Sequence, residues 1–138
     1  SANGALVSPS ELLLMKGMTA QGYAVLREHV TALPAGTTLN VNTASMPVLM
    51  SLAEGVTASD AEALVEGRPY EELKDFVAHS ALAGRGDKLK DDVLNVGSDY
   101  FLITAQVQFG ALSQQRYSVL QRNEKGEGRI MMRAQGAY

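Results

Sequence analysis

The sequence has 138 residues and no cysteine. This absence excludes a disulfide scaffold, a metal site with thiolate ligands and a cysteine nucleophile. Long apolar runs are also missing: the run from Leu12 to Met15 is far shorter than the roughly 20 residues that a membrane-spanning helix needs. There is no excess of positive charge either, because the formal net charge is −3. Non-specific binding to nucleic acid is therefore disfavoured.

The composition that remains is that of a globular protein, with 46% hydrophobic and 20% charged residues. The charge is divided unevenly along the chain. Residues 1–99 carry 7 basic and 13 acidic side chains, whereas residues 100–138 carry 5 basic and 2 acidic side chains. The hydrophobic pattern changes at about the same place. We therefore expect a helical domain over residues 1–92 and a domain of strands over residues 93–138.

Capping residues, glycines and prolines divide the first half into short helices. The pattern predicts helices over residues 10–16 and 19–28, a brief extended segment over 39–43, and three further helices. The first of these three contains Val48, Leu49 and Leu52, the second contains Ala61, Leu64 and Val65, and the third covers residues 71–79. Residues 83–92 are polar and are predicted to form a linker or surface loop.

An internal repeat relates two of these helical segments at an offset of 38 residues. Six pairs match: Pro9 with Pro47, Leu14 with Leu52, Gly17 with Gly55, Thr19 with Thr57, Ala20 with Ala58, and Leu26 with Leu64. Each copy is predicted as a helix, a Gly-apolar-Thr turn and a second helix. Short helices need a partner for their apolar stripes, so we expect the two hairpins to pack together.

The last third alternates apolar and polar residues, as half-buried strands do. Strands are predicted over residues 100–109, 115–122 and 129–134, joined as an antiparallel meander. Such a sheet needs a cover for its apolar face, and these residues provide little of their own. The predicted fold class is therefore α+β, with a helical SAM-like or helix–hairpin–helix-like module followed by a small antiparallel sheet.

The segment Asn40 to Ser45, followed by a helical hairpin around Gly55, resembles a helix–hairpin–helix module. In DNA-binding versions the backbone N–H groups of the hairpin and nearby basic residues hold a phosphate. Residues 54–75 carry seven acidic and two basic side chains, which would repel a phosphate. A helical packing module is the favoured interpretation, and a helix–hairpin–helix DNA-binding protein is the alternative.

No constellation of residues suggests catalysis, so we do not expect an enzyme. The sequence has two histidines, His29 and His79, and no Gly-x-Ser-x-Gly or Gly-rich phosphate loop. Four acidic residues offer oxygen ligands of the type that calcium prefers, namely Asp87, Asp91, Asp92 and Asp99. Their spacing fits no EF-hand loop and lysines lie between them, so an ordinary polar loop is favoured.

Five segments, in this order, resemble the minor pseudopilin K family of type II secretion systems (GspK-like). They are Glu11–Thr19, Leu39–Ser45, Gly67–Tyr70, Ser98–Leu102 and Ser118–Arg122. The resemblance implies a pilin-type sheet that carries a helical domain, in a protein that lies at the tip of a periplasmic pseudopilus and assembles with other minor pseudopilins. It also makes exported substrates and the outer-membrane channel candidate contacts. Calcium is bound in that family, but no ligand residue is assigned here, and no nucleic acid is expected as a partner.

The family begins with a long hydrophobic helix and a first strand, which this chain does not contain. We therefore expect the chain to be the C-terminal part of a longer protein anchored at the periplasmic face of the bacterial inner membrane. The absent helix would also explain the uncovered sheet. Val107, Phe109 and Val119 are predicted to pack against a helix from another piece of chain.

Overall fold

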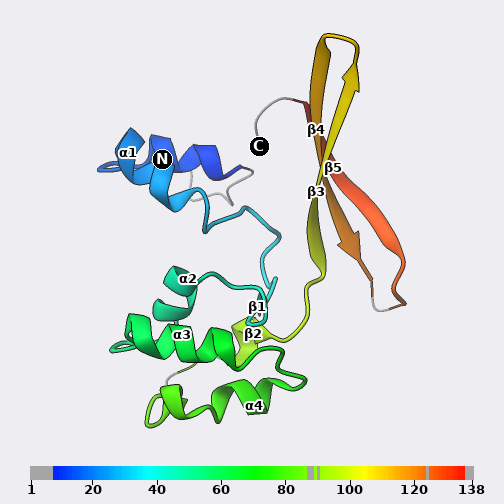
Figure 1. Cartoon of the computed structure of the whole chain (residues 1–138). Helices are drawn as coiled ribbons and strands as arrows, with labels where there is room; N and C mark the ends of the chain where they lie inside the picture. Colours follow the sequence, from blue (N-terminus) through cyan, green and yellow to red (C-terminus); the bar gives the residue numbers. More distant parts are fainter. Residues whose placement is uncertain (1–7, 87–88, 90, 124, 136–138) are drawn as a thin grey trace. The chain divides into compact units, whose positions relative to one another are not determined.

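The computed structural model describes residues 8–86, 89, 91–123 and 125–135, and these fold into two compact units. The first unit ends at Gly97 and the second begins at Ser98. The first holds the helices and the second is a three-stranded antiparallel sheet, which confirms the predicted α+β class (Figure 1). Among the described residues, no helix is both long enough and apolar enough to cross a bilayer.

The first unit is built from short helices and one pair of very short strands. In chain order its elements are η1 (Pro9–Leu14), α1 (Ala20–Leu26), β1 (Leu39–Asn40), α2 (Met46–Met50), α3 (Ala58–Glu66), α4 (Leu73–Val77), η2 (Ser80–Leu82), η4 (Asp91–Val93) and β2 (Leu94–Asn95). The predicted helices are present, although most are shorter, and two short 3₁₀ helices, η2 and η4, lie where no helix was predicted. The 3₁₀ helix η1 begins earlier than predicted, because Ser8 and Glu11 form a capping box at its start.

The internal repeat is confirmed in the backbone. Gly17 and Gly55 both adopt positive φ angles, of 92° and 81°, which only glycine enters without steric cost. Two residues later Thr19 and Thr57 each cap a helix, because their side chains accept a hydrogen bond from the backbone N–H three residues on. The same local chemistry therefore produces the same turn twice.

The hydrophobic core of the first unit centres on the second copy of the repeat. Its buried members come from α2, α3, α4, η2 and β2 and from the segments before and between them: Val41, Ala44, Leu49, Val56, Ala61, Leu64, Tyr70, Phe76, Leu82, Leu89 and Leu94. Leu89 lies within the stretch that was predicted to be a polar linker. The prediction of a polar loop was wrong at this residue, because the side chain of Leu89 packs into the core although its neighbours in the sequence are charged.

The side chain of Asn42 fastens three backbone segments together. Its Nδ2 atom donates to the carbonyl oxygens of Tyr70 and Val96, each at 2.9 Å, and its Oδ1 atom accepts from the backbone N–H of Tyr70 at 2.8 Å. Beside it, β1 pairs in parallel with β2, and Val41 donates to the carbonyl of Asn95. The pairing includes β2 in the first unit, so the structure divides the chain after Gly97 rather than after residue 92.

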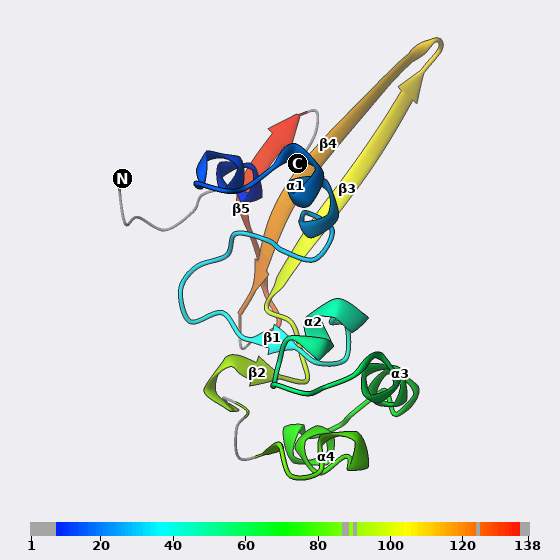
Figure 2. The same cartoon turned by 90° about the vertical axis from the view of Figure 1, so that its left-hand side faces the viewer.

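The second unit consists of β3 (Tyr100–Phe109), β4 (Leu112–Arg122) and β5 (Gly128–Gln135) in the order β3-β4-β5. This is the predicted meander, with a longer second strand. All ten residues of β3 pair with β4, from Tyr100 opposite Gln121 to Phe109 opposite Leu112. The pairing with β5 begins only at Arg116, so β3 and β4 continue past β5 as a two-stranded ribbon (Figures 1 and 2).

A β-bulge in β5 changes which of its side chains share a face. Val119 lies opposite Met132 and Leu120 lies opposite Ile130, which leaves Met131 as the extra residue. Strict alternation along the strand would place Ile130 and Met132 on one side. The inserted residue shifts this period of two and sends Ile130 to the opposite face from Met132.

We predict that Asn42→Ala lowers the free energy of unfolding by about 2–3 kcal/mol, because three part-buried hydrogen bonds to backbone groups are lost. Urea unfolding followed by circular dichroism measures the change. Asn95→Ala is the matched control, since the Asn95 side chain accepts only from the adjacent Val96 N–H and is exposed. Equal effects of the two substitutions would contradict the role given to Asn42.

Candidate functional site

The three residues predicted to contact another helix do not share one face of the sheet. Residues directly opposite each other on antiparallel strands point to the same side. Val107 and Phe109 are in register with Gln114 and Leu112, whereas Val119 is in register with Leu102, one step out of phase with them. Val107 and Phe109 are 58% and 83% exposed, and Val119 is 8% exposed. A single helix on one side of the sheet therefore cannot contact all three.

The face that contains Val107 and Phe109 is the apolar one, and we call it the Phe109 face. On β3 every residue of this face is apolar: Phe101, Ile103, Ala105, Val107 and Phe109. The register adds Leu112 and Leu120 from β4 and Ile130 from β5. All of these side chains except Leu120 are exposed. The Phe109 face is therefore an apolar stripe of the kind that usually marks a contact surface.

Arginines border this stripe on β4 and β5. Arg116 lies opposite Ala105, and Arg133 lies opposite Ser118, so both belong to the Phe109 face. Arg122 belongs to it as well, because its guanidinium lies 5.2 Å from the centre of the Phe101 ring. The Phe109 face therefore combines an uncharged apolar strip on β3 with positive charge on the two other strands.

The opposite face of the sheet is more polar. Along β3 it carries Tyr100, Leu102, Thr104, Gln106 and Gln108, and Gln106 donates to the hydroxyl of Ser113 across the pair. Val119 belongs to this face and is its most buried apolar residue among those described. The side on which Val119 lies therefore has a different chemistry from the Phe109 face.

The second predicted site, the helical hairpin around Gly55, is already occupied by a carboxylate of the protein. Asp60 Oδ2 accepts from the backbone N–H and from the hydroxyl of Thr57, each at 2.9 Å, while Thr57 Oγ1 accepts from the N–H of Asp60. These bonds lower the pKa of Asp60, and Arg85 contributes a smaller lowering. A phosphate held by this turn would have to displace a carboxylate that the helix N-terminus already stabilises.

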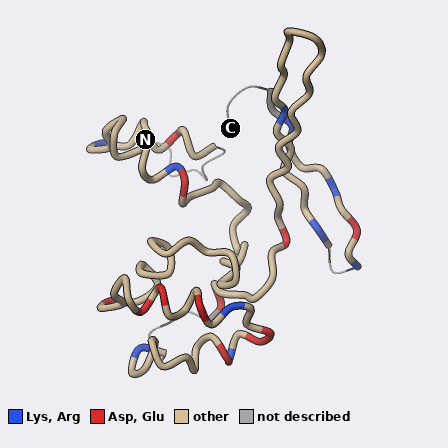
Figure 3. Tube along the Cα trace, viewed as in Figure 1, with Lys and Arg blue, Asp and Glu red and all other residues tan. Residues whose placement is uncertain are grey.

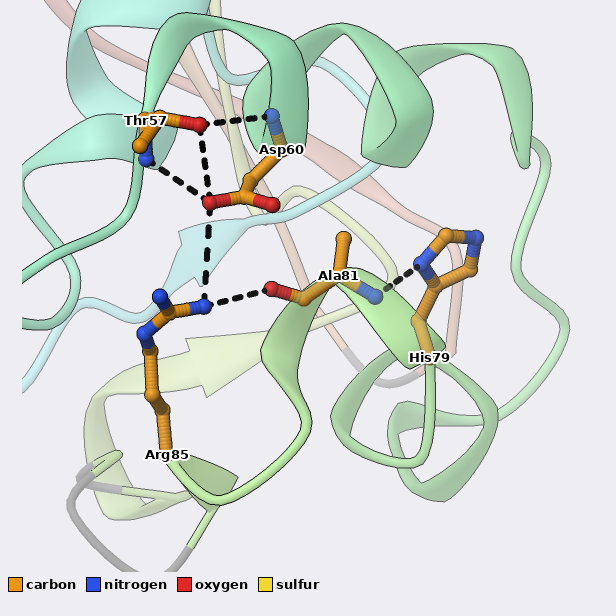
Figure 4. A network of polar contacts seen from close by, with 5 residues as sticks. All are labelled: Thr57, Asp60, His79, Ala81 and Arg85. Atoms are coloured by element: carbon orange, nitrogen blue, oxygen red, sulfur yellow. Dashed lines mark hydrogen bonds and ion pairs between the residues drawn. The ribbon is translucent and has the colours of Figure 1, made fainter.

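The same carboxylate extends the network to η2 (Figure 4). Arg85 Nη1 lies 3.7 Å from Asp60 Oδ2 and donates to the carbonyl of Ala81 at 2.9 Å. The N–H of Ala81 donates in turn to Nδ1 of His79, which caps η2. Arg85 and His79 thus take part in holding α3 and η2 together.

Arg68 is also used by the fold. Its Nη2 atom donates to the carbonyl of Ala44, within the Asn40–Ser45 segment, and burial lowers its pKa. Tyr70 lies nearby with its hydroxyl donating to Leu64, and burial raises the pKa of that phenol. Arg68 Nε is buried without a hydrogen-bond partner in the part of the chain that the structure describes. The basic side chain closest in sequence to the hairpin motif is thus partly desolvated and turned inward.

Charge completes the argument against a phosphate site. Acidic side chains gather along α3 and the segment leading into α4 (Figure 3), where Glu62, Glu66, Glu71 and Glu72 are all exposed. The Asn40–Ser45 motif had suggested helix–hairpin–helix chemistry. The side-chain amide of Asn42 in this motif instead makes its hydrogen bonds within the protein. The geometry therefore does not support the DNA-binding alternative.

The four acidic residues that were weighed as calcium ligands, and for which an ordinary polar loop was favoured, lie partly outside the described residues. Asp87 is not described, and of Asp91 only the backbone is, whereas Asp92 and Asp99 are exposed. Within the described residues, no group of three or more acidic or histidine side chains is placed to hold a metal ion. The candidate calcium site stays a prediction.

Sequence reasoning missed several residues that matter to these surfaces. The pairing of Thr57 with Asp60 has a readable signal, because an acidic residue three positions after a capping threonine is typical of a capping box. The arginine border of the Phe109 face has no such signal. It depends on the strand register, which the sequence does not specify at the turn around Gly110.

Comparison with known proteins gives three findings. A family model described as type II secretion system (T2SS), protein K, matches residues 39–97. Type II secretion system protein K of Pseudomonas aeruginosa is 37% identical over 139 residues, which cover 99% of this chain and 40% of that protein. The protein of the same name from Dickeya chrysanthemi is 31% identical over 144 residues, again covering 99% of this chain and 40% of the relative. The chain thus spans less than half the length of these relatives.

The third finding is structural. One chain of the crystal structure of the GspK-GspI-GspJ complex from the enterotoxigenic Escherichia coli type 2 secretion system matches with a TM-score of 0.83 and 28% identity. The match covers 99% of this chain and 50% of that chain. Both units described above therefore have counterparts in a solved structure.

We predict that Asp60 stabilises the folded state at neutral pH and that this stabilisation is lost in acid. The pKa of Asp60 is lowered in the folded state from its ordinary value of 3.8, so its contribution is complete above that value and is lost as the pH falls through the folded pKa. Urea midpoints of the unsubstituted chain and of Asp60→Asn should differ at pH 6, and the difference should shrink as the pH falls below 3.8. Glu62→Gln, an exposed neighbour on α3, is the control and should show no such convergence. A constant difference across this range would contradict the assignment.

Proposed function

We propose that this chain, a relative of type II secretion system protein K, forms part of a minor pseudopilin. In this role it is a structural component of the pseudopilus tip, where it assembles with other minor pseudopilins to support protein export. The observation that carries the proposal is the combination of 37% identity along 99% of the chain with a TM-score of 0.83 to a chain of the GspK-GspI-GspJ complex.

The proposed partners are the two other minor pseudopilins that correspond to GspI and GspJ in that complex. Secreted substrates and the outer-membrane channel are further candidates for contact. We propose that the whole protein lies at the periplasmic face of the inner membrane. The names of the relatives describe a secretion-system protein and not an enzyme, and we propose no catalytic role.

The Phe109 face is the surface best suited to assembly. Its apolar strip on β3 would be buried by a helix from another piece of chain, and the exposure of Val107 and Phe109 supports this. The arginines that border it, Arg116, Arg122 and Arg133, favour a helix that carries carboxylates along one flank. Val119 is not part of this contact, because the register places it on the other side.

The first test is assembly in solution. A longer form of the protein, with the additional residues that its relatives contain but without a membrane helix, is mixed with the two other minor pseudopilins and followed by analytical ultracentrifugation. We expect a discrete heteromeric species, and the series is repeated with and without calcium. Free components at every salt and calcium concentration would contradict the proposal, as would salt-dependent DNA binding by the chain alone.

A second prediction concerns the face that makes the contact. The double substitution Val107→Ser with Phe109→Ser should weaken the complex at least about tenfold, which corresponds to about 1.4 kcal/mol of lost burial. Both side chains are exposed in this chain, so folding should be unaffected, and circular dichroism checks this.

The matched control is Gln106→Ser with Gln108→Ser, which changes the same strand on the opposite face. It should leave the affinity within about twofold of the unsubstituted protein. An equal loss of affinity in both double variants would show that the Phe109 face is not the contact surface.

A further inference from the structure

The two copies of the repeat share the glycine turn and the threonine-capped second helix, but their surroundings differ. In the second copy the apolar residues of the turn and the second helix are buried: Val56, Ala61 and Leu64 belong to the core. At the same offset of 38 residues, the first copy has Met18, Tyr23 and Leu26, all of which are only half-buried. The local sequence chemistry is therefore repeated, but the burial is not.

The second copy is covered by the residues that follow it in the chain. Phe76 on α4 and Leu82 on η2 are fully buried in the same core, with Leu73 and Val77 packed against it. Residues of η2 contact α3 directly. A short helical segment, with apolar residues three and four positions apart, thus completes the second copy.

In the first copy the corresponding apolar surface is exposed. Leu14 is 85% exposed, although its counterpart Leu52 packs against the core. The surface also lacks the charge that a solvated helix normally carries, because residues 17–26 contain no charged side chain. A helix that is uncharged along its whole length is typical of one that is covered on more than one side.

We propose that the first copy binds a short amphipathic helical segment in the position that residues 73–82 take on the second copy. The face that binds it consists of Leu14, Met18, Tyr23 and Leu26, which we call the Leu14 face. The segment carries aliphatic or aromatic residues at helical spacing, as Leu73, Phe76 and Val77 do. This inference depends on the repeat and does not depend on the proposed function.

The occupant is a segment of the same polypeptide outside these 138 residues. Each relative that matches 99% of this chain is much longer, since the match covers only 40% of it. The second copy is itself covered by a segment of its own chain. A tethered segment also binds at a high effective concentration, so a small apolar face suffices to hold it.

The test uses the absence of cysteine, which allows one thiol to be placed at a chosen position. Leu14→Cys is prepared in this chain and in the full-length protein purified alone, and the rate of reaction with a thiol reagent is measured in each. We expect a rate close to that of a free thiol in this chain, and at least tenfold slower labelling in the full-length protein.

Two controls bracket the result. Gln21→Cys, at an exposed position of α1, should react rapidly in both proteins, and Leu52→Cys, at the matching position of the second copy, should react slowly in both. Equally fast labelling of Leu14→Cys in both proteins would overturn the proposal. So would protection that depends on the concentration of this chain, which indicates a second copy, or protection that requires an added partner protein.

Discussion

The helical unit depends on one amide side chain. Asn42 has two N–H donors and one carbonyl acceptor, and each of them bonds to a backbone group of a distant segment. A longer or a charged side chain could not present the same three groups at this position. These bonds hold the start of α4 and the end of β2 beside β1. The core residues between them can then meet, although none of the helices around them exceeds nine residues.

Helices this short contribute little stability by themselves, so the unit must gain it from caps and side-chain contacts. Thr57 and Asp60 satisfy each other at the start of α3, and Arg85 and His79 extend these bonds to η2. Arg68 is bonded to Ala44. The polar residues of the motif that resembles a phosphate-binding hairpin therefore form hydrogen bonds within the unit. This is a physical reason why a similar motif can serve DNA binding in one protein and packing in another.

The sequence predicted much of this fold because the signals are local. A glycine with positive φ followed by a capping threonine marks both helical hairpins, and alternating residues mark the strands of the sheet. Features that depend on distant partners were not predictable in the same way. The parallel pairing of β1 with β2, the burial of Leu89 and the bulge at Met131 each require knowledge of which segments meet. The candidate contact residues show both cases, since alternation alone predicts that Val107 and Phe109 share a face, whereas only the register shows that Val119 lies on the other face.

The two units leave apolar surface exposed for different reasons. On the sheet, a strand with five apolar residues on one side and mostly polar residues on the other needs a single broad cover, and arginines at its border select the charge of that cover. On the first helical hairpin, the exposed surface is the equivalent of one that the second hairpin buries with its own chain. The apolar surface of the sheet therefore suits recognition of a helix with a defined charge pattern. The surface of the first helical hairpin has no charge with which to discriminate between partners. A tethered segment is therefore the occupant that its chemistry favours.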